Sequence, residues 1–161
     1  MSRPVWDRTF GDILQTLTKR SRCLKYKTAA MIVCKTQIMA FGYNGTFAKH
    51  KECDDYWRSY HLKKRIATPF DEWIKTREFR ELHRDWSRLN EIHAEVNALN
   101  WISKRDISDD YVLYTTYSPC DACAKEIISY GIKHIKYEIE YPSGGDALAR
   151  LRSVGIGCDK I

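Results

Sequence analysis

The sequence predicts a three-layer α/β/α domain that carries one insertion, and two observations lead to this fold class. Segments with helical and strand-like patterns of apolar residues alternate along most of the 161 residues. Such alternation is typical of a sheet that is covered by helices on both faces. Between about residues 46 and 90 the alternation is lost, and this segment is crowded with charge and holds three of the five tryptophans. We therefore expect a single domain, residues 1–161, with a helical insertion at about 46–90.

The N-terminal part of the chain is expected to form a helix and a hairpin. Apolar residues recur at helical spacing from Val5 to Leu17, after Pro4, which predicts a first helix. Two short β-like runs follow at residues 28–35 and 37–45 with almost no separation, and this arrangement predicts a hairpin. The Asn44-Gly45 pair is expected to end the hairpin in a turn.

The remaining elements follow from the same kind of pattern. Residues 70–86 of the insertion carry aromatic side chains at roughly helical spacing, which predicts an amphipathic helix that packs on the main core. The later elements are expected to be a helix at 91–102, a strand at 111–117, a helix at 120–131, a strand at 134–141 and a helix at 146–155. Gly131 is the natural stop of the helix before it, and the C-terminal tail is too short to assign.

Composition limits the class of protein and its partners. With 43% hydrophobic and 30% charged residues, the chain has the ordinary composition of a soluble domain. The formal net charge of +6 is consistent with an anionic partner, either a nucleotide phosphate or a nucleic-acid backbone. There is no apolar run of about 18 residues for a membrane span, and the N-terminus lacks a signal-peptide pattern. We expect a cytoplasmic protein, in the host cytoplasm if a phage encodes it, whose six cysteines are thiols or metal ligands.

The strongest functional signal is the motif HAE at 93–95 followed by SPCDAC at 118–123. One imidazole and two thiolates, from His93, Cys120 and Cys123, supply three zinc ligands, and a catalytic zinc keeps its fourth position for water. Each motif lies where a helix is expected to begin, so that the ligands converge and the positive helix ends favour thiolates. This order of motifs is the signature of zinc nucleobase deaminases.

Glu95 is expected to move protons and not to bind the metal. On a helix its side chain points roughly 200° around the axis from that of His93, two residues earlier. It is suited to take a proton from the attacking water and to pass it to the ring nitrogen and the leaving ammonia. The alternative is a structural zinc site, which would want a fourth protein ligand and would have no use for Glu95.

Four stretches carry a resemblance to a known family. They are SRCLKYKTAAMIV, FGYNGT, HRDWSRLNEIHAEVNAL and LYTTYSPCDACAKEIISYGIKHIKY. In this order they resemble the deoxycytidylate deaminases, the bacteriophage T-even type in particular. The resemblance implies a cytidine-deaminase-like fold with a mixed five-stranded sheet, and hydrolysis of dCMP to dUMP and ammonia in pyrimidine deoxynucleotide metabolism. It also implies a homohexamer that dCTP activates and dTTP inhibits.

The resemblance further implies roles for single residues in the substrate site. Asn44 would contact the deoxyribose hydroxyl, and Tyr141, at the end of the fourth strand, would contact the substrate. The alternative for Asn44 is turn chemistry without any ligand. Lysines near the matched motifs are candidates for pairing the phosphate dianion, namely Lys25, Lys27 and Lys104, although most lysines are solvated surface charges.

A second zinc is also implied, held by Cys23, His83 and Glu91, with Cys53 as a candidate fourth ligand. All of these are chemically suitable zinc ligands. The alternative is that His83 and Glu91 merely decorate an amphipathic helix and that Cys23 packs in the core.

Effector control is the point where the chain departs from the family. There the GYNG motif runs into a loop with Gly or Pro that belongs to the nucleotide effector site, whereas residues 46–57 here contain neither. Lys49, His50 and Lys51 could still meet a triphosphate accompanied by Mg²⁺. We expect activation by dCTP to be weaker than in the family, or absent.

Three competing functions stay open at this point. The first is a transfer-RNA adenosine deaminase, which shares both zinc motifs and would use the basic, aromatic-rich insertion as a nucleic-acid surface. The context NEIHAE, the second-zinc residues and the GYNG start count against it, so nucleic acid is not the expected partner. The second is a deaminase that also accepts dCTP or a 5-substituted dCMP. The third is a non-catalytic zinc-binding module, which has no use for Glu95.

Overall fold

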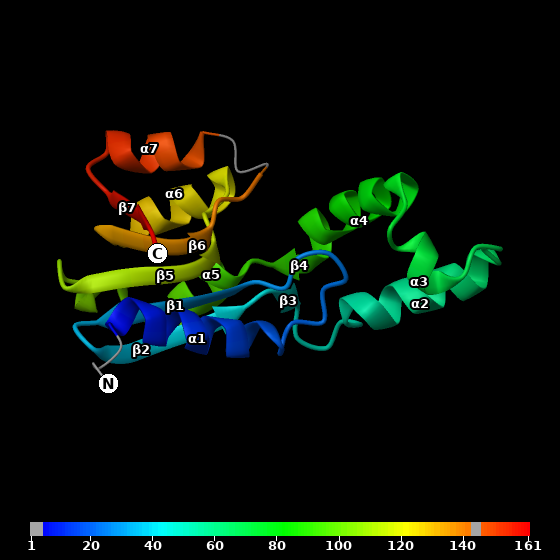
Figure 1. Ribbon diagram of the computed structural model, residues 1–161, viewed down its shortest axis with the longest axis horizontal. Helices are drawn as coiled ribbons and strands as arrows, with labels where there is room; N and C mark the ends of the chain where they lie inside the picture. The colour runs from blue at the N-terminus through cyan, green and yellow to red at the C-terminus, as the bar shows by residue number, and fades with distance from the viewer. Residues whose placement is uncertain (1–4, 143–145) are drawn as a thin grey trace.

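The computed structural model describes residues 5–142 and 146–161, and its largest element is a five-stranded mixed sheet (Figure 1). The strands are β1 (Ala29–Cys34), β2 (Gln37–Tyr43), β5 (Tyr111–Tyr117), β6 (His134–Ile139) and β7 (Gly157–Lys160). In the spatial order β2-β1-β5-β6-β7, β1 is antiparallel to both of its neighbours, whereas β5, β6 and β7 are parallel. The expected mixed sheet is confirmed, and the unassigned C-terminal tail supplies its fifth strand.

Helices cover both faces of this sheet and complete three layers (Figure 1). On one face lies α1 (Trp6–Thr18), and on the other lie α5 (Ala94–Leu99), α6 (Asp121–Tyr130) and α7 (Ala147–Ser153). Met31 and Val33 of β1 pack toward α1, while Ala30 and Ile32 pack toward the other three helices. Successive side chains of a strand point to opposite faces, so a strand covered on both faces reads as a continuous apolar run. The three-layer α/β/α fold class is confirmed.

The insertion consists of α2 (Cys53–Lys64), α3 (Phe70–Trp73) and α4 (Arg77–Asn90), which lie beside the sheet (Figure 1). The expected single amphipathic helix over residues 70–86 is interrupted. Thr76 caps α4 by accepting a hydrogen bond from the backbone N–H of Phe79 at 3.2 Å, so a new helix begins there. The expected packing on the main core is also wrong, because the aromatic side chains of these helices form a buried cluster of their own.

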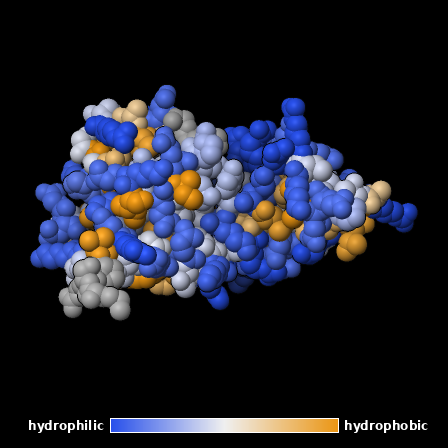
Figure 2. Space-filling model, viewed as in Figure 1, coloured by the Kyte–Doolittle hydropathy of each residue, from blue (hydrophilic) through white to orange (hydrophobic). Residues whose placement is uncertain are grey.

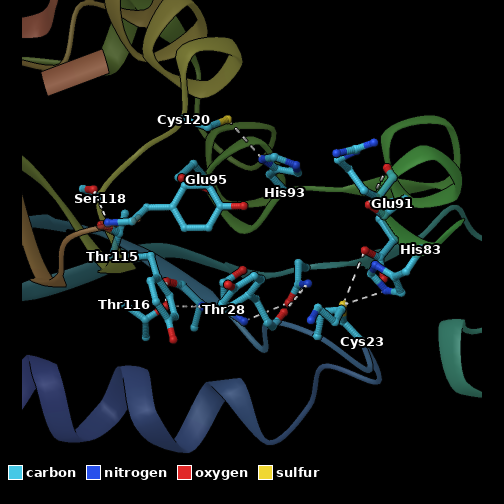
Figure 3. A pocket seen from close by; sticks show the side chains of 18 of the residues that line it. Cys23, Thr28, His83, Glu91, His93, Glu95, Thr115, Thr116, Ser118 and Cys120 are labelled. Atoms are coloured by element: carbon cyan, nitrogen blue, oxygen red, sulfur yellow. Dashed lines mark hydrogen bonds between the residues drawn. The ribbon is translucent and has the colours of Figure 1, made fainter. Parts of the chain in front are cut away.

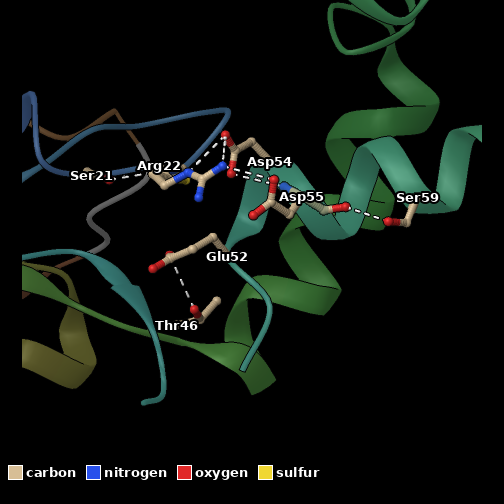
Figure 4. Close-up of polar contacts among 8 residues, drawn as sticks. Ser21, Arg22, Thr46, Glu52, Asp54, Asp55 and Ser59 are labelled. Atoms are coloured by element: carbon tan, nitrogen blue, oxygen red, sulfur yellow. Dashed lines mark hydrogen bonds and ion pairs between the residues drawn. The ribbon is translucent and has the colours of Figure 1, made fainter. Parts of the chain in front are cut away.

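An ion-pair network ties the start of α2 to the segment before β1 (Figure 4). Arg22 donates from Nε and Nη2 to Asp54 Oδ2 at 3.0 and 2.8 Å, and from Nη2 to Asp55 Oδ1 at 2.9 Å. Both carboxylates lie in the first turn of α2, where the positive end of the helix also favours them. Because Arg22 adjoins Cys23 and Asp54 adjoins Cys53 in the sequence, the network holds these two cysteines near each other.

A two-stranded sheet joins the two ends of the insertion, where the sequence predicted a turn and a helix. The strands β3 (Gly45–Thr46) and β4 (Glu91–Ile92) pair antiparallel. The prediction of a turn at Asn44-Gly45 is therefore wrong, since Gly45 continues as a strand and neither residue has a positive φ. The helix expected at 91–102 begins only at Ala94, with His93 as its N-cap, because pairing with β3 keeps the two preceding residues extended.

Substitution of Gly42 is expected to be costly because β2 packs closely against α5. A Cβ atom at this position would lie 2.5 Å from both the Ala94 carbonyl oxygen and the Ala98 backbone nitrogen, which are too rigid to yield cheaply. Overpacking of this kind costs about 1–3 kcal/mol, and we expect Gly42→Ala to lower the melting temperature accordingly. Gly45→Ala is the matched control, because its Cβ would meet nothing within 4 Å. Equal melting temperatures for the two variants would contradict this prediction.

None of the helices in the described ranges is both long and apolar enough to span a membrane.

Candidate active site

The first group of metal-binding side chains forms where two helices begin. His93 is the N-cap of α5, Cys120 is the N-cap of α6, and Cys123 lies in the first turn of α6. His93 Nδ1 lies 3.5 Å from Cys120 Sγ and 3.3 Å from Cys123 Sγ. Two such ligands bound tetrahedrally to one zinc ion would be about 3.5 Å apart, given typical Zn–S and Zn–N lengths. The three side chains predicted from the sequence are therefore brought together in a geometry that fits zinc.

The electrostatics of this group favour a thiolate. The pKa of Cys120 is lowered to about 3, chiefly by a hydrogen bond from Cys123 and secondly by one from His93. The hydrogen bond to Cys120 in turn raises the pKa of His93 to about 9. The Cys123 pKa is raised, because its thiol is the donor in the pair. Deprotonated sulfur is the form that binds a metal, so the pair is suited to a divalent cation.

Glu95 lies beside these ligands in the first turn of α5 and is 8% exposed. Burial is the largest cause that raises its pKa above the ordinary value for a carboxyl group, while the charge of His93 acts in the opposite direction. A raised pKa lets a carboxylate accept a proton near neutral pH and release it again. Figure 3 shows Glu95, His93 and Cys120 along one wall of a cavity.

A second group of four side chains gathers where the insertion meets the sheet. Cys23, Cys53, His83 and Glu91 each offer a ligand atom within 4.8 Å of all the others. His83 Nε2 lies 3.6 Å from Cys23 Sγ and 3.3 Å from Cys53 Sγ, and Cys23 Sγ lies 3.5 Å from Glu91 Oε2. His83 is only 4% exposed, so it does not decorate the outside of α4. The group has the ligand number of a structural zinc site.

Glu91 gives an independent reason to expect a cation in this second group. Its Oε1 atom is buried and has no hydrogen-bond partner among the described residues. The pKa of Glu91 is raised to about 8, chiefly by burial and secondly by the charge of Cys23. A buried carboxylate oxygen without a partner is costly unless a cation or donor satisfies it. The residues present thus fit a bound zinc ion.

A cavity of about 420 Å³ extends between the two groups (Figure 3). Its lining includes His93 and Cys120 of the first group, the neighbouring Glu95, and Cys23, His83 and Glu91 of the second group. Thr115, Thr116 and Ser118, at and just after the carboxyl end of β5, add polar groups to the wall. This volume is typical of small-molecule sites. Ligands of α/β sheets also bind at the carboxyl ends of strands.

Asn44 and Tyr141, to which the resemblance assigns substrate contacts, both line the cavity. The Asn44 amide donates to the Tyr26 carbonyl at 2.8 Å and accepts from the Thr28 N–H at 2.9 Å, so it also fixes the chain before β1. Tyr141 follows β6, and its backbone N–H donates to Ser118 Oγ at 2.8 Å.

The three candidate lysines for the phosphate fall in different places. Lys25 lines the cavity, whereas Lys27 is exposed and outside the lining. Lys104 lies in the short helix η1 (Lys104–Asp106), donates to Ser129 Oγ at 3.1 Å and sits over the Tyr130 ring. These contacts attach Lys104 to α6 and not to the cavity.

The sequence-based prediction missed three arginines of α4 that line the cavity: Arg77, Arg80 and Arg84. Their spacing of three and four residues is the available signal, because it places all three on one face of a helix. That spacing can be interpreted only once the fold shows which face of α4 is turned toward the cavity.

Comparison with known proteins agrees with this geometry. The family model described as "Cytidine and deoxycytidylate deaminase zinc-binding region" matches residues 4–139. The deoxycytidylate deaminases of Enterobacteria phages T2 and T4 are each 32% identical over 167 aligned positions, which cover 92% of this chain and 88% and 86% of those proteins. The crystal structure of dCMP deaminase from the cyanophage S-TIM5 in complex with dCMP and dUMP aligns over 100% of both chains, with a TM-score of 0.69 and 26% identity. The chain belongs to the cytidine and deoxycytidylate deaminase family of zinc-dependent hydrolases.

Proposed function

We propose that this protein hydrolyses dCMP to dUMP and ammonia in pyrimidine deoxynucleotide metabolism. The observation that carries the proposal is the buried carboxyl of Glu95 beside the His93, Cys120 and Cys123 group, in a cavity of about 420 Å³. The similarity to deoxycytidylate deaminases of phages T2 and T4 supports the choice of dCMP as substrate.

The residues of the first group are assigned distinct roles in this reaction. A zinc ion held by His93, Cys120 and Cys123 would supply Lewis-acid activation of the attacking water. Glu95 accepts one proton from that water and delivers it to ring atom N3, and it transfers the other to the departing amino group. The oxygen stays on C4 of the ring while the C4–N bond breaks, so water and dCMP give dUMP and ammonia. Burial raises the pKa of Glu95 above the ordinary value for a carboxyl group, which favours proton uptake.

A panel of substrates tests the proposal. The panel contains dCMP, dCTP, a 5-substituted dCMP, deoxycytidine, and a transfer-RNA anticodon stem-loop with a target adenosine. We expect the highest kcat/KM for dCMP, measured by ammonia release, and no release from the RNA. Comparable turnover of the adenosine would overturn the proposal in favour of an RNA deaminase. Release from none of the substrates by zinc-loaded protein would point to a non-catalytic zinc-binding module.

The second group is proposed to hold a structural zinc ion through Cys23, His83, Glu91 and Cys53. These residues come from the segment before β1 and from α2, α4 and β4, so one ion would fix the insertion to the main sheet. Asn44 is proposed to contact the deoxyribose hydroxyl. Its amide keeps a second N–H and a second lone pair beyond the two backbone hydrogen bonds that it makes.

Assembly and effector binding are further parts of the proposal. Strand β2 is an edge strand with exposed Ile38, Met39 and Phe41, and Trp101 nearby is 80% exposed. Contiguous apolar side chains at a surface favour association, and the number of subunits in the proposed homohexamer is the one that the family resemblance implies. Activation by dCTP with Mg²⁺ is proposed to be weak, because the segment from Thr46 to Cys53 is held at one end by β3 and at the other by α2. Inhibition by dTTP belongs to the same proposal.

A further inference from the structure

We propose that Arg80 and Arg84 of α4, together with Lys25, bind the phosphate of the nucleotide and set the preference for a nucleotide over a nucleoside. This inference rests on the proposed function, because it concerns the part of the same substrate that lies farthest from the reacting ring. It gives the insertion a role in specificity. The helix of the insertion that supplies His83 to the second group also forms the cationic wall of the cavity.

The position of α4 relative to the cavity is the first observation. Arg77, Arg80 and Arg84 all line the cavity, as does Lys25 from the segment before β1. The arginines share one helical face, and His83, between two of them, is buried in the second group at the end of the cavity away from Thr115 and Ser118 (Figure 3). Figure 2 shows strongly hydrophilic side chains gathered over the region of α4. A cavity with a carboxyl group at one end and cations at the other suits a cytosine ring joined to a phosphate.

The pairing of these cations is the second observation. Arg77 forms an ion pair with Glu81, with Nε and Oε1 2.8 Å apart, and its side chain is 86% exposed. The Arg84 guanidinium forms its only ion pair within the described residues with its sequence neighbour Asp85, at 3.4 Å. Arg80 and Lys25, which both line the cavity, have no ion-pair partner in that part of the chain. Two neighbouring cations without an anion are stabilised by a phosphate dianion.

The carboxylates of the lining do not neutralise Arg80 or Lys25. Glu81 is paired with Arg77, Glu91 belongs to the second group, and Glu95 serves the reaction. Arginine suits the proposed role because its planar fork binds two phosphate oxygens at once, while Lys25 adds a point charge. The charges of Arg80 and Lys25 are thus available to the substrate.

Variants of Arg80 separate phosphate recognition from other roles. We expect Arg80→Ala to lower kcat/KM for dCMP by ~10–100-fold, mainly through KM, because a lost charge-assisted hydrogen bond has about this effect. Deoxycytidine lacks the phosphate, so its kcat/KM should change by less than about threefold. Arg80→Lys should restore part of the loss, and the double variant Lys25→Ala/Arg80→Ala should lower the preference for dCMP further. Arg88→Ala is the control, since Arg88 is exposed on α4 outside the cavity lining.

A binding measurement keeps this test separate from the test of the proposed function. Calorimetry in the zinc-loaded Glu95→Gln background, in which dCMP should not be turned over, should show dCMP binding at least ~10-fold more weakly when Arg80→Ala is added, and inorganic phosphate should compete with dCMP only when Arg80 is present. Equal decreases in kcat/KM for dCMP and deoxycytidine in Arg80→Ala would show that Arg80 has only a structural role and would overturn the inference. Unchanged binding of dCMP to this variant would also overturn it. A wild type that binds dCMP through Arg80 but releases no ammonia would refute the proposed function and leave this inference standing.

Discussion

Replacing Glu95 by glutamine is expected to abolish nearly all turnover while the zinc content and the fold are retained. The amide has almost the same shape as the carboxyl, but it can neither take up nor release a proton. Loss of general acid–base catalysis typically lowers the rate by ~10²–10⁴-fold, and the loss is larger where one group transfers protons twice. The measurement is kcat for dCMP together with zinc analysis and the melting temperature of the variant.

The matched control for this experiment is Glu126→Gln, because Glu126 is an exposed carboxylate on α6 that does not line the cavity. It should keep the wild-type rate. Should Glu95→Gln retain more than about a tenth of the wild-type kcat, Glu95 would lose its assigned role in proton transfer.

Removal of one ligand of the second group is expected to release one zinc ion per chain and to destabilise the fold. We expect about two zinc ions in the wild type and about one in Cys53→Ser or His83→Ala, since a structural site with three remaining ligands is incomplete. These ligands are buried between the insertion and the sheet, so loss of the ion leaves buried polar groups unsatisfied. Leaving buried charged groups without their partner lowers the free energy of unfolding by about 3–5 kcal/mol, so the melting temperature should fall by ~10 °C.

Cys34→Ser serves as the control for the metal analysis, because Cys34 is a free thiol of β1 outside both groups. It should keep both ions. A wild type with a single zinc ion, which Cys53→Ser and His83→Ala also retain, would eliminate the second site. Cys23→Ser should behave as Cys53→Ser does, because the two sulfurs both lie within 3.6 Å of His83 Nε2.

Local patterns in the sequence were sufficient for four of the five strands of the main sheet and for the first group of ligands, whereas the C-terminal strand β7 was not assigned. The run from Tyr111 to Tyr117 was expected as a strand, and it forms β5 with these bounds. Gly131 ends α6 with φ 84°, a conformation that glycine adopts without steric cost. His93, Cys120 and Cys123 were predicted together because helix starts bring ligands of two separate motifs to one place. The strand and the helix stop depend on residues that are close in the sequence, and each of the two ligand motifs is itself a short local pattern.

What only the tertiary structure decided depends on contacts between residues distant in the sequence. Pairing of β3 with β4 overrides the turn preference of Asn44-Gly45 and delays the start of α5. Packing of aromatic side chains against one another, and not on the sheet, gives the insertion its own core. That core sets the direction of α4, and the direction decides that Arg80 lines the cavity. A helical pattern specifies which residues share a face, but the free energy that orients this face comes from burial against segments that lie elsewhere in the chain.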